Sequence, residues 1–261
     1  MRDVVAERRP DLLELAVQVL GEDPFPRAQE GTDFAQPAIF CASLAGWDAL
    51  GRPTGDFMAG HSLGELGALV AAGAIDERDG LELVTLRGRL MQDAGERSGD
   101  GGMLALLGSG AAENAARIAD RHGLSVANDN SPQQVVLSGA TGSLPAAAAD
   151  AKELGLRAME LSVSGAFHSP MMASAVPDFT AALERVTLSE PHVPVISAVT
   201  AQPFDDIRRR LADALTSPVR WRETLLALHE LGAARFVEVG PGRVLTGLTK
   251  RTLQDVELVN A

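Results

Sequence analysis

The stretch "DFMAGHSLGELGAL", residues 56–69, joins an apolar strand pattern to a helix pattern through Gly60-His61-Ser62-Leu63-Gly64. A Gly-x-Ser-x-Gly sequence between a strand and a helix is typical of a sharp turn that projects the serine hydroxyl outward. We expect Gly60 and Gly64 to lack side chains because the helix packs tightly behind the strand. We expect the N–H of Leu63 to point at an oxyanion. Ser62 is therefore a candidate nucleophile, for either a hydrolase or an acyltransferase.

The same order of strand and helix recurs near the end of the sequence. "ARFVEVG" at 234–240 precedes the helix pattern "VLTGLTKRTL" at 244–253. Strands that alternate with helices predict parallel strands joined by crossover helices. We therefore expect an α/β fold whose large subdomain is a hydrolase-like parallel sheet.

Residues 100–162 show a different order of strand and helix patterns. Apolar strand patterns at 103–108, 124–129, 133–139 and 157–163 alternate with helix patterns at 111–123 and 143–155. The order βαββαβ is that of a ferredoxin-like unit, bounded by the glycine-rich "SGDGG" at 98–102 and by Ser164. The sequence thus predicts a large subdomain made of residues 1–99 and 163–261, with a ferredoxin-like subdomain, residues 100–162, inserted into it. Ligand sites are often found in a cleft between two such parts.

Composition narrows the class of protein. The formal net charge of the 261 residues is -12, which argues against nucleic acid as a partner. No apolar run approaches the ~18 residues of a membrane span, and the start of the sequence carries no secretory signal pattern. The one cysteine, Cys41, lies in an apolar run and is expected to be a buried hydrophobic residue. We expect a cytoplasmic protein with no membrane partner.

A nucleophilic serine needs a base, and two histidines are candidates. His168 follows the apolar strand pattern "AMELSV" and precedes a helix that begins near Met171, a position where sheet enzymes place catalytic groups. His229, with Asp205 or Asp206 upstream, satisfies the order serine, acid, histidine of an α/β-hydrolase. The surroundings of His229 are those of an ordinary helix residue, so His168 is favoured.

Arg87 lies on an apolar helix face. Its neighbours at i-4, i-3, i+3 and i+4 are Leu83, Val84, Leu90 and Met91. A guanidinium there needs an anionic partner, because an unpaired buried charge is unfavourable. That partner is either an internal carboxylate such as Glu65 or the free carboxylate of a substrate held by the arginine fork.

Two further stretches are less specific. "VEVGPGRVLTGL" at 237–248 lacks the Gly-x-Gly-x-x-Gly spacing of a nucleotide site. "VANDNSPQQVVLSG" at 126–139 places Asn128, Asn130 and Ser131 in an expected turn, and turn chemistry explains them.

Taken together, the motifs resemble those of the malonyl-CoA:acyl carrier protein transacylases, from near residue 1 to about residue 253. The similar segments, in the family's order, are "GHSLGE" at 60–65, "RGRLMQ" at 87–92, "VANDNSPQQVVLSG" at 126–139, "GAFHSPMM" at 165–172, "SPVRW" at 217–221 and "VEVGPGRVLTGL" at 237–248. The inserted ferredoxin-like subdomain matches the family as well.

The resemblance implies a role for each of these residues. Ser62 would be the acylated nucleophile, His168 its base, oriented by the main-chain carbonyl of Ala214, and Arg87 the clamp for the malonyl carboxylate. Phe167 is similar to the form associated with malonyl rather than methylmalonyl units, and Leu63 and His61 would contact the substrate.

The resemblance also implies the partners of the reaction. They are malonyl-CoA and acyl carrier protein, with no cofactor and no metal, and the protein is expected to act as a monomer in fatty acid or polyketide synthesis. The alternatives are a serine hydrolase or thioesterase, and a truncated family member with weak or no activity.

The start of the sequence departs from the family. The family begins with a strand and a Gly-Gln-Gly loop that supplies a second oxyanion N–H, and the sequence given has no counterpart of them. A chain without that donor is expected to transfer malonyl slowly, because one lost donor typically reduces the rate by roughly 10²–10³. It is also expected to be less stable, because a sheet edge is left unpaired.

Overall fold

The computed structural model describes residues 1–163 and 165–260, and these residues form an α/β fold with three separate sheets. The helices are α1 (Arg2–Arg8), α2 (Pro10–Leu20), α3 (Thr32–Ala49), α4 (Gly64–Ala71), α5 (Glu77–Ser98), α6 (Ala111–His122), α7 (Leu144–Glu153), α8 (Val176–Leu183), α9 (Ile207–Asp213), α10 (Trp221–Glu230) and α11 (Val244–Thr252). The strands are β1 (Met58–Ala59), β2 (Gly101–Leu107), β3 (Ser125–Ser131), β4 (Gln134–Ala140), β5 (Arg157–Glu160), β6 (Val195–Ser197), β7 (Gln202–Pro203), β8 (Arg235–Glu238) and β9 (Glu257–Asn260). Two short 3₁₀ helices, η1 (Thr141–Ser143) and η2 (Pro170–Ala175), complete the elements.

The strand before the serine motif lies in a small sheet of order β1-β6-β7. β1 pairs with β6 in parallel, with Met58 opposite Val195, and β7 runs antiparallel to β6. β8 pairs in parallel with β9 in a separate sheet. Within the described residues, the parallel pairing expected of one large sheet is therefore divided between two small sheets. A strand bonds only to a backbone about 4.8 Å away. The neighbour at that distance is β6 for β1 and β9 for β8, so the two strands belong to different sheets.

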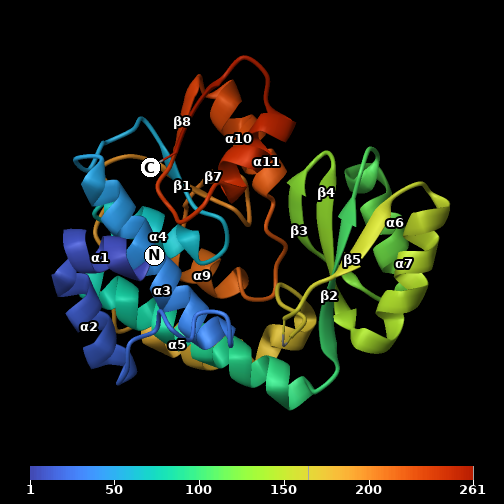
Figure 1. The fold of residues 1–261 in the computed structure, drawn as a ribbon, viewed down its shortest axis with the longest axis horizontal. Coiled ribbons are helices and arrows are strands. Elements are labelled where there is room, and N and C mark those ends of the chain that lie inside the picture. The colour runs from blue at the N-terminus through green and yellow to red at the C-terminus, as the bar shows by residue number, and fades with distance from the viewer. Residues whose placement is uncertain (164, 261) are drawn as a thin grey trace.

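Residues 101–160 form the elements β2-α6-β3-β4-η1-α7-β5, and their four strands make an antiparallel sheet of order β3-β4-β2-β5. Figure 1 shows this sheet at the right of the molecule with α6 and α7 on its outer face. Side chains alternate along β2, so Leu104 and Leu106 pack under the two helices while Met103 and Ala105 belong to a second cluster. Ser164, where the end of this unit is expected, lies outside the described residues.

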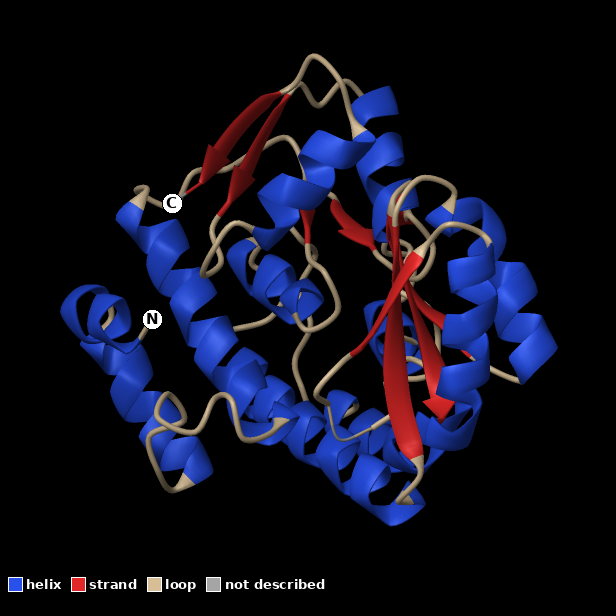
Figure 2. Ribbon diagram, turned by 45° about the vertical axis from the view of Figure 1, so that its right-hand side comes forward, coloured by secondary structure: helices blue, strands red, loops and turns tan. Residues whose placement is uncertain are grey.

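The largest apolar core lies among the helices at the other side of the molecule, drawn in blue and teal in Figure 1. It includes Phe40 and Leu44 of α3 and Leu81 and Leu83 of α5. A Cβ on Gly88 would lie 2.7 Å from the carbonyl oxygen of Thr32, so α3 and α5 approach closely at the residue next to Arg87. Figure 2 shows the same helices turned by 45°, with α5 running toward the four-stranded sheet.

The four-stranded sheet is joined to the segment before α10. Val219 donates its N–H to the carbonyl of Ala127 at 2.8 Å, and Asp129 donates its N–H to the carbonyl of Val219 at 2.9 Å. The Arg222 guanidinium adds an ion pair to Asp129 at 2.6 Å. These bonds fix the outer edge of β3 against the rest of the molecule.

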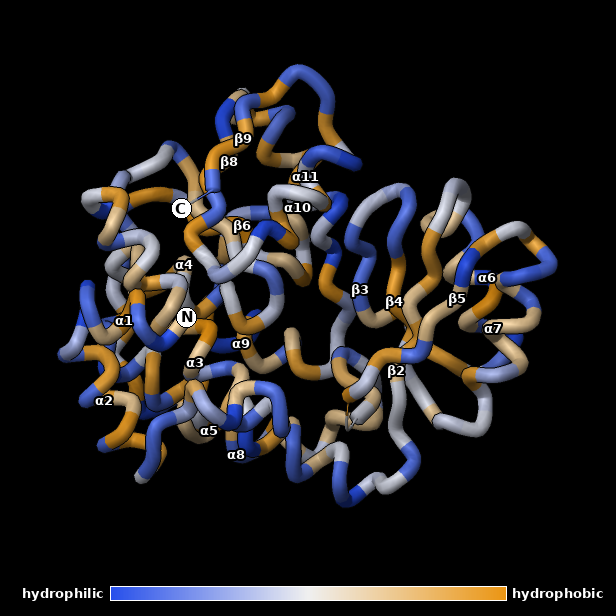
Figure 3. Tube along the Cα trace, viewed as in Figure 1, coloured by the Kyte–Doolittle hydropathy of each residue, from blue (hydrophilic) through white to orange (hydrophobic). Residues whose placement is uncertain are grey.

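Of the helices that the structure describes, none has both the length and the apolar character to cross a bilayer. Figure 3 shows hydrophilic and hydrophobic positions interleaved along α2 and α5.

Candidate active site

Ser62 occupies the turn between β1 and α4 with a φ of 55°. This left-handed conformation is unusual for a residue with a side chain and is a sign of local backbone strain. A Cβ on Gly60 would lie 1.9 Å from the carbonyl carbon of Gly64, so position 60 requires glycine. A Cβ on Gly64 would meet nothing within 4 Å. The expectation that Gly64 is also required by tight packing is wrong, because its missing side chain would point into open space.

His168 lies next to the serine. Its Nε2 is 2.9 Å from Oγ of Ser62, and its Nδ1 is 2.9 Å from the carbonyl oxygen of Ala214. A carbonyl only accepts, so Nδ1 carries the proton and Nε2 is free to accept the proton of the serine. Burial, with a further contribution from the positive charge of Arg87, lowers the pKa of His168 to about 3. The ring is therefore neutral at physiological pH and arranged as a base.

The Arg87 guanidinium also reaches the serine. The residue is 3% exposed, and Leu83, Val84, Leu90 and Met91 are buried around it as the periodicity predicts. Nη2 donates to Oγ of Ser62 at 3.1 Å, and Nη1 donates to Oε1 of Gln36 at 2.8 Å. Burial lowers the pKa of Arg87 to about 10, which leaves it cationic at neutral pH. Arg87 makes no ion pair with any carboxylate of the described residues.

Glu65 is the internal carboxylate considered as the partner of Arg87. It is buried, and its Oε1 accepts the backbone N–H of Ala198 at 2.8 Å. Burial raises the pKa of Glu65 to about 7, and the charge of Arg87 opposes that rise without a direct ion pair. Glu65 thus connects α4 to the end of β6 and interacts with the guanidinium through its charge but not through a direct ion pair.

His61 faces the four-stranded sheet. Its Nε2 lies 2.7 Å from Oδ1 of Asn130, and its ring meets the Trp221 ring edge to face at 5.6 Å. Burial lowers the pKa of His61. The expected turn at Asn128, Asn130 and Ser131 is wrong, because β3 continues through register shifts to Ser131 before the chain turns. Asn130 therefore points at the serine turn from a strand.

The remaining residues implied for the substrate are Phe167 and Leu63. Phe167, directly before His168, packs against both the large core and the cluster of Met103, Ala105, Ala127 and Val136. Leu63 is the N-cap of α4 and packs against the large core.

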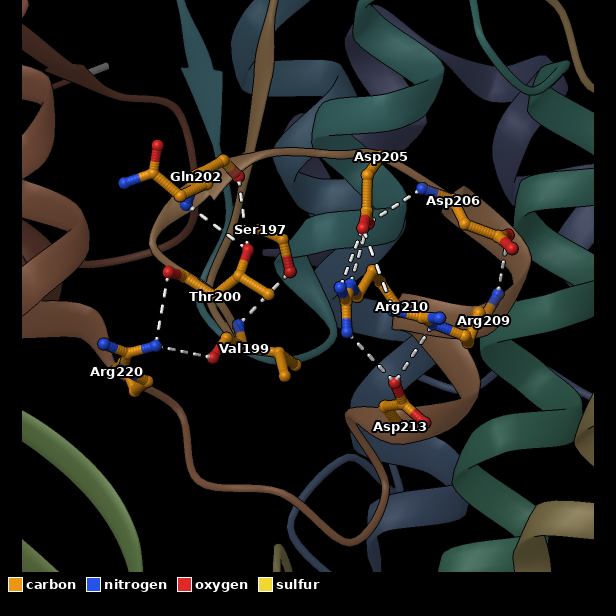
Figure 4. Close-up of polar contacts among 10 residues, drawn as sticks. All are labelled: Ser197, Val199, Thr200, Gln202, Asp205, Asp206, Arg209, Arg210, Asp213 and Arg220. Atoms are coloured by element: carbon orange, nitrogen blue, oxygen red, sulfur yellow. Dashed lines mark hydrogen bonds and ion pairs between the residues drawn. The ribbon is translucent and has the colours of Figure 1, made fainter.

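The hydrolase-order alternative is not assembled. His229 is exposed on α10 and bonds the carbonyl of Ala233 at 3.3 Å. Figure 4 shows Asp205 paired with Arg210, and Asp206 accepting the backbone N–H of Arg209 at the start of α9. The Asp205–Arg210 ion pair, 2.8 Å long, lowers the pKa of Asp205. These groups serve local structure.

Two residues of the site were not found from the sequence, Gln36 and Asn130. Gln36 is a buried glutamine in the apolar helix stretch "DFAQPAIF", a signal like that of Arg87. Asn130 had no such signal, because its partner His61 is distant in the sequence. Among the described residues, no group of three or more histidine, cysteine or acidic side chains is arranged to hold a metal. The site brings together a serine hydroxyl, a neutral imidazole and a buried guanidinium.

Comparison with known proteins shows the family to which the chain is similar. The acyl transferase domain family matches residues 13–261. The malonyl CoA-acyl carrier protein transacylase of Synechocystis sp. is 43% identical over 236 residues, covering 88% of this chain and 78% of that protein. The polyketide biosynthesis protein ThaF of Burkholderia thailandensis is 40% identical over 264 residues, covering 94% of this chain but 22% of that longer protein.

Solved structures agree with the sequence comparison. A malonyl-transacylase in complex with its type II PKS acyl-carrier protein, PlMCAT:AntF, superposes with a TM-score of 0.88 at 34% identity, covering 100% of this chain and 91% of that one.

Proposed function

This chain belongs to the acyl transferase family, and from that premise we propose that it transfers a malonyl group from coenzyme A to the phosphopantetheine thiol of an acyl carrier protein. Relatives that carry the name malonyl CoA-acyl carrier protein transacylase support the substrate pair. Such transfer serves fatty acid or polyketide synthesis, and the matched relatives include polyketide biosynthesis proteins.

One observation carries the proposal beyond family membership. Arg87 is buried, cationic and bonded to Ser62 Oγ at 3.1 Å, and its other named partner is the neutral amide of Gln36. A buried guanidinium that makes no ion pair with an internal carboxylate favours an acyl group that brings its own negative charge. Malonyl has such a carboxylate.

Acylation begins with the Ser62 hydroxyl donating its hydrogen bond to Nε2 of His168. As Oγ attacks the thioester carbon, the proton passes to Nε2, and the Ala214 carbonyl holds the ring through Nδ1–H. The carbon–sulfur bond then breaks, and the coenzyme A thiolate takes the proton from His168. The product of this half-reaction is a malonyl ester on Ser62.

Transfer reverses the roles. His168 takes the proton of the carrier protein's phosphopantetheine thiol as the sulfur attacks the ester carbon. The carbon–oxygen bond breaks, and the proton returns to Oγ of Ser62. In both steps the N–H of Leu63, at the N-terminus of α4, is proposed to stabilise the oxyanion.

The same proposal assigns the neighbouring groups. Phe167 limits the space for a branch methyl, which favours malonyl over methylmalonyl. His61, held by Asn130, contacts the substrate at the border between the two parts. The two parts themselves are assigned as a hydrolase-like subdomain of residues 1–99 and 163–261 and an inserted ferredoxin-like subdomain of residues 100–162. The strand order β3-β4-β2-β5 supports the second assignment.

Location and assembly follow from the chemistry. The acceptor is a free thiol, which persists in a reducing compartment, and this favours the cytoplasm. The proposal also includes action as a monomer.

The test is acyl labelling followed by transfer. Intact-protein mass spectrometry after mixing with malonyl-CoA should show one malonyl adduct, which disappears when holo acyl carrier protein is added. Ser62→Ala should show no adduct. An undiminished adduct on that variant would remove Ser62 as the nucleophile, and release of free malonate instead of malonyl-carrier protein would identify a hydrolase.

A further inference from the structure

Gln36 is the neutral hydrogen-bond partner of the Arg87 guanidinium. It lies on α3 with 2% of its surface exposed, and its Oε1 accepts from Nη1 of Arg87 at 2.8 Å. Its Nε2 donates to Oγ1 of Thr32 at 2.9 Å and lies 3.5 Å from Sδ of Met91. Arginine has only donors, so the amide oxygen must face Arg87. The amide is thereby fixed in one orientation.

The close contact of α3 with α5 brings this amide to the guanidinium. Gly88 allows the backbone of α5 to approach that of Thr32, one turn before Gln36 on α3. The Arg87 fork then has one nitrogen on Gln36 and the other on Ser62. Gln36 therefore directs the fork toward the nucleophile without altering its charge.

We propose that Gln36 is a positioning residue that makes the site selective for acyl groups carrying a carboxylate, because its neutral amide aims the Arg87 guanidinium at Ser62 without forming an ion pair with it. This inference rests on the proposed role of Arg87 and extends it to a residue that does not touch the acyl group. A carboxylate at position 36 would form an internal ion pair with Nη1 and compete with the substrate. Glu65, the buried acid already present near Arg87, accepts the backbone N–H of Ala198.

The decisive variant is Gln36→Glu, which changes one amide to a carboxyl of nearly the same shape. Transfer from malonyl-CoA and from acetyl-CoA to carrier protein is measured for each protein, with kcat and KM separated. The ratio of malonyl to acetyl kcat/KM should fall about ten- to hundredfold, which corresponds to the usual free energy of a charge-assisted hydrogen bond. Acetyl transfer should be kept or increased. The malonyl loss should appear chiefly in KM and should diminish as lower pH protonates the introduced carboxyl.

A second variant separates charge from packing. Gln36→Met keeps a neutral side chain of similar volume but removes the acceptor. The Arg87 fork is then less well aimed, so malonyl transfer should slow and the malonyl-to-acetyl ratio should fall, by less than in Gln36→Glu, while acetyl transfer is kept. Gln18→Glu, on the exposed face of α2, controls for the added charge. Circular dichroism melting shows which variants are folded.

The outcomes distinguish this inference from the proposed function. If Arg87→Ala lowers the malonyl-to-acetyl ratio but Gln36→Glu keeps the wild-type value, the proposed role of Gln36 is wrong. The proposed role of Arg87 as the carboxylate-binding residue is then retained. If Arg87→Ala also keeps the wild-type ratio, the clamp itself fails. If Gln36→Glu does not fold, the methionine variant decides, because a wild-type malonyl-to-acetyl ratio there would contradict the positioning role of Gln36. Equal loss of both acyl groups in both variants would show a purely structural role.

Discussion

Nε2 of His168 lies 2.9 Å from Oγ of Ser62, and the Ala214 carbonyl fixes the other ring nitrogen as the proton donor. The pair is therefore poised for proton transfer before substrate binds. Because both the buried ring and the nearby Arg87 charge oppose protonation, the pKa of His168 is lowered to about 3. The free site is ready to act across the neutral range.

The first prediction follows from that pair. His168→Ala should slow acylation of Ser62 by malonyl-CoA roughly 10²–10⁴-fold, the usual contribution of a general base, when measured by rapid quench and mass spectrometry. The Glu65→Gln background removes the buried carboxyl whose pKa is about 7. In that background the acylation rate should not fall between pH 7 and pH 5. A fall with a midpoint near 6.5 would mean that His168 has an ordinary pKa and that this description of its surroundings is wrong.

The second prediction concerns the two glycines of the serine turn. Gly60→Ala should abolish activity or folding, since the new Cβ would overlap the backbone at Gly64. Gly64→Ala should fold, remain active and gain up to about 1 kcal/mol of unfolding free energy, because alanine restricts the unfolded chain more than glycine does. Denaturant melts and transfer assays of the two variants make the comparison. Similar damage in both would contradict the turn geometry.

The third prediction uses the pH dependence of stability. The pKa of Glu65 rises from 4.5 to about 7 on folding, so the native state holds this proton more tightly than the unfolded state does. The contribution of Glu65 to stability therefore falls as pH rises from 4.5 to 7, by at most about 3 to 4 kcal/mol at 1.36 kcal/mol per pKa unit. Glu65→Gln lacks this titration, so its unfolding free energy relative to wild type should increase across the same window. A constant difference from pH 4.5 to 8 would refute the raised pKa.

The fourth prediction separates the contacts between the two parts. Asn130→Ala removes the partner of His61 and should reduce malonyl transfer roughly ten- to hundredfold through misplacement of the serine turn. Arg222→Met breaks the ion pair to Asp129 on the same strand and should affect stability more than transfer. Equal effects of the two variants on transfer, at matched stability, would assign Asn130 to general bracing.

Local sequence patterns predicted three side chains that the structure brings into contact. Ser62 was found from glycine spacing, His168 from its place after a strand, and Arg87 from an apolar stripe. Each signal lies within a few residues of the group that it identifies. The family resemblance added the carbonyl of Ala214, which then appears at 2.9 Å from the ring.

The parts that could not be predicted depend on contacts between distant segments. Asn130 reaches His61 across 69 positions, and Gln36 reaches Arg87 across 51. The division of the expected parallel sheet into two has the same origin, since β1 and β8 each pair with a strand that sequence pattern alone does not select. A local pattern specifies which face of an element is buried, and the partner on that face is set by the packing of the whole chain.

The fifth prediction tests the central claim, that Arg87 selects an acyl group by its carboxylate. Single-turnover acylation of Ser62 is measured with malonyl-CoA and with acetyl-CoA in wild type and in Arg87→Ala. Malonyl acylation should fall about a hundredfold or more, in keeping with the removal of a buried charge pair. Acetyl acylation should stay within about threefold of wild type, so the ratio of the two rates collapses. Equal loss with both acyl groups would show that Arg87 supports only the structure of the site and would contradict the account.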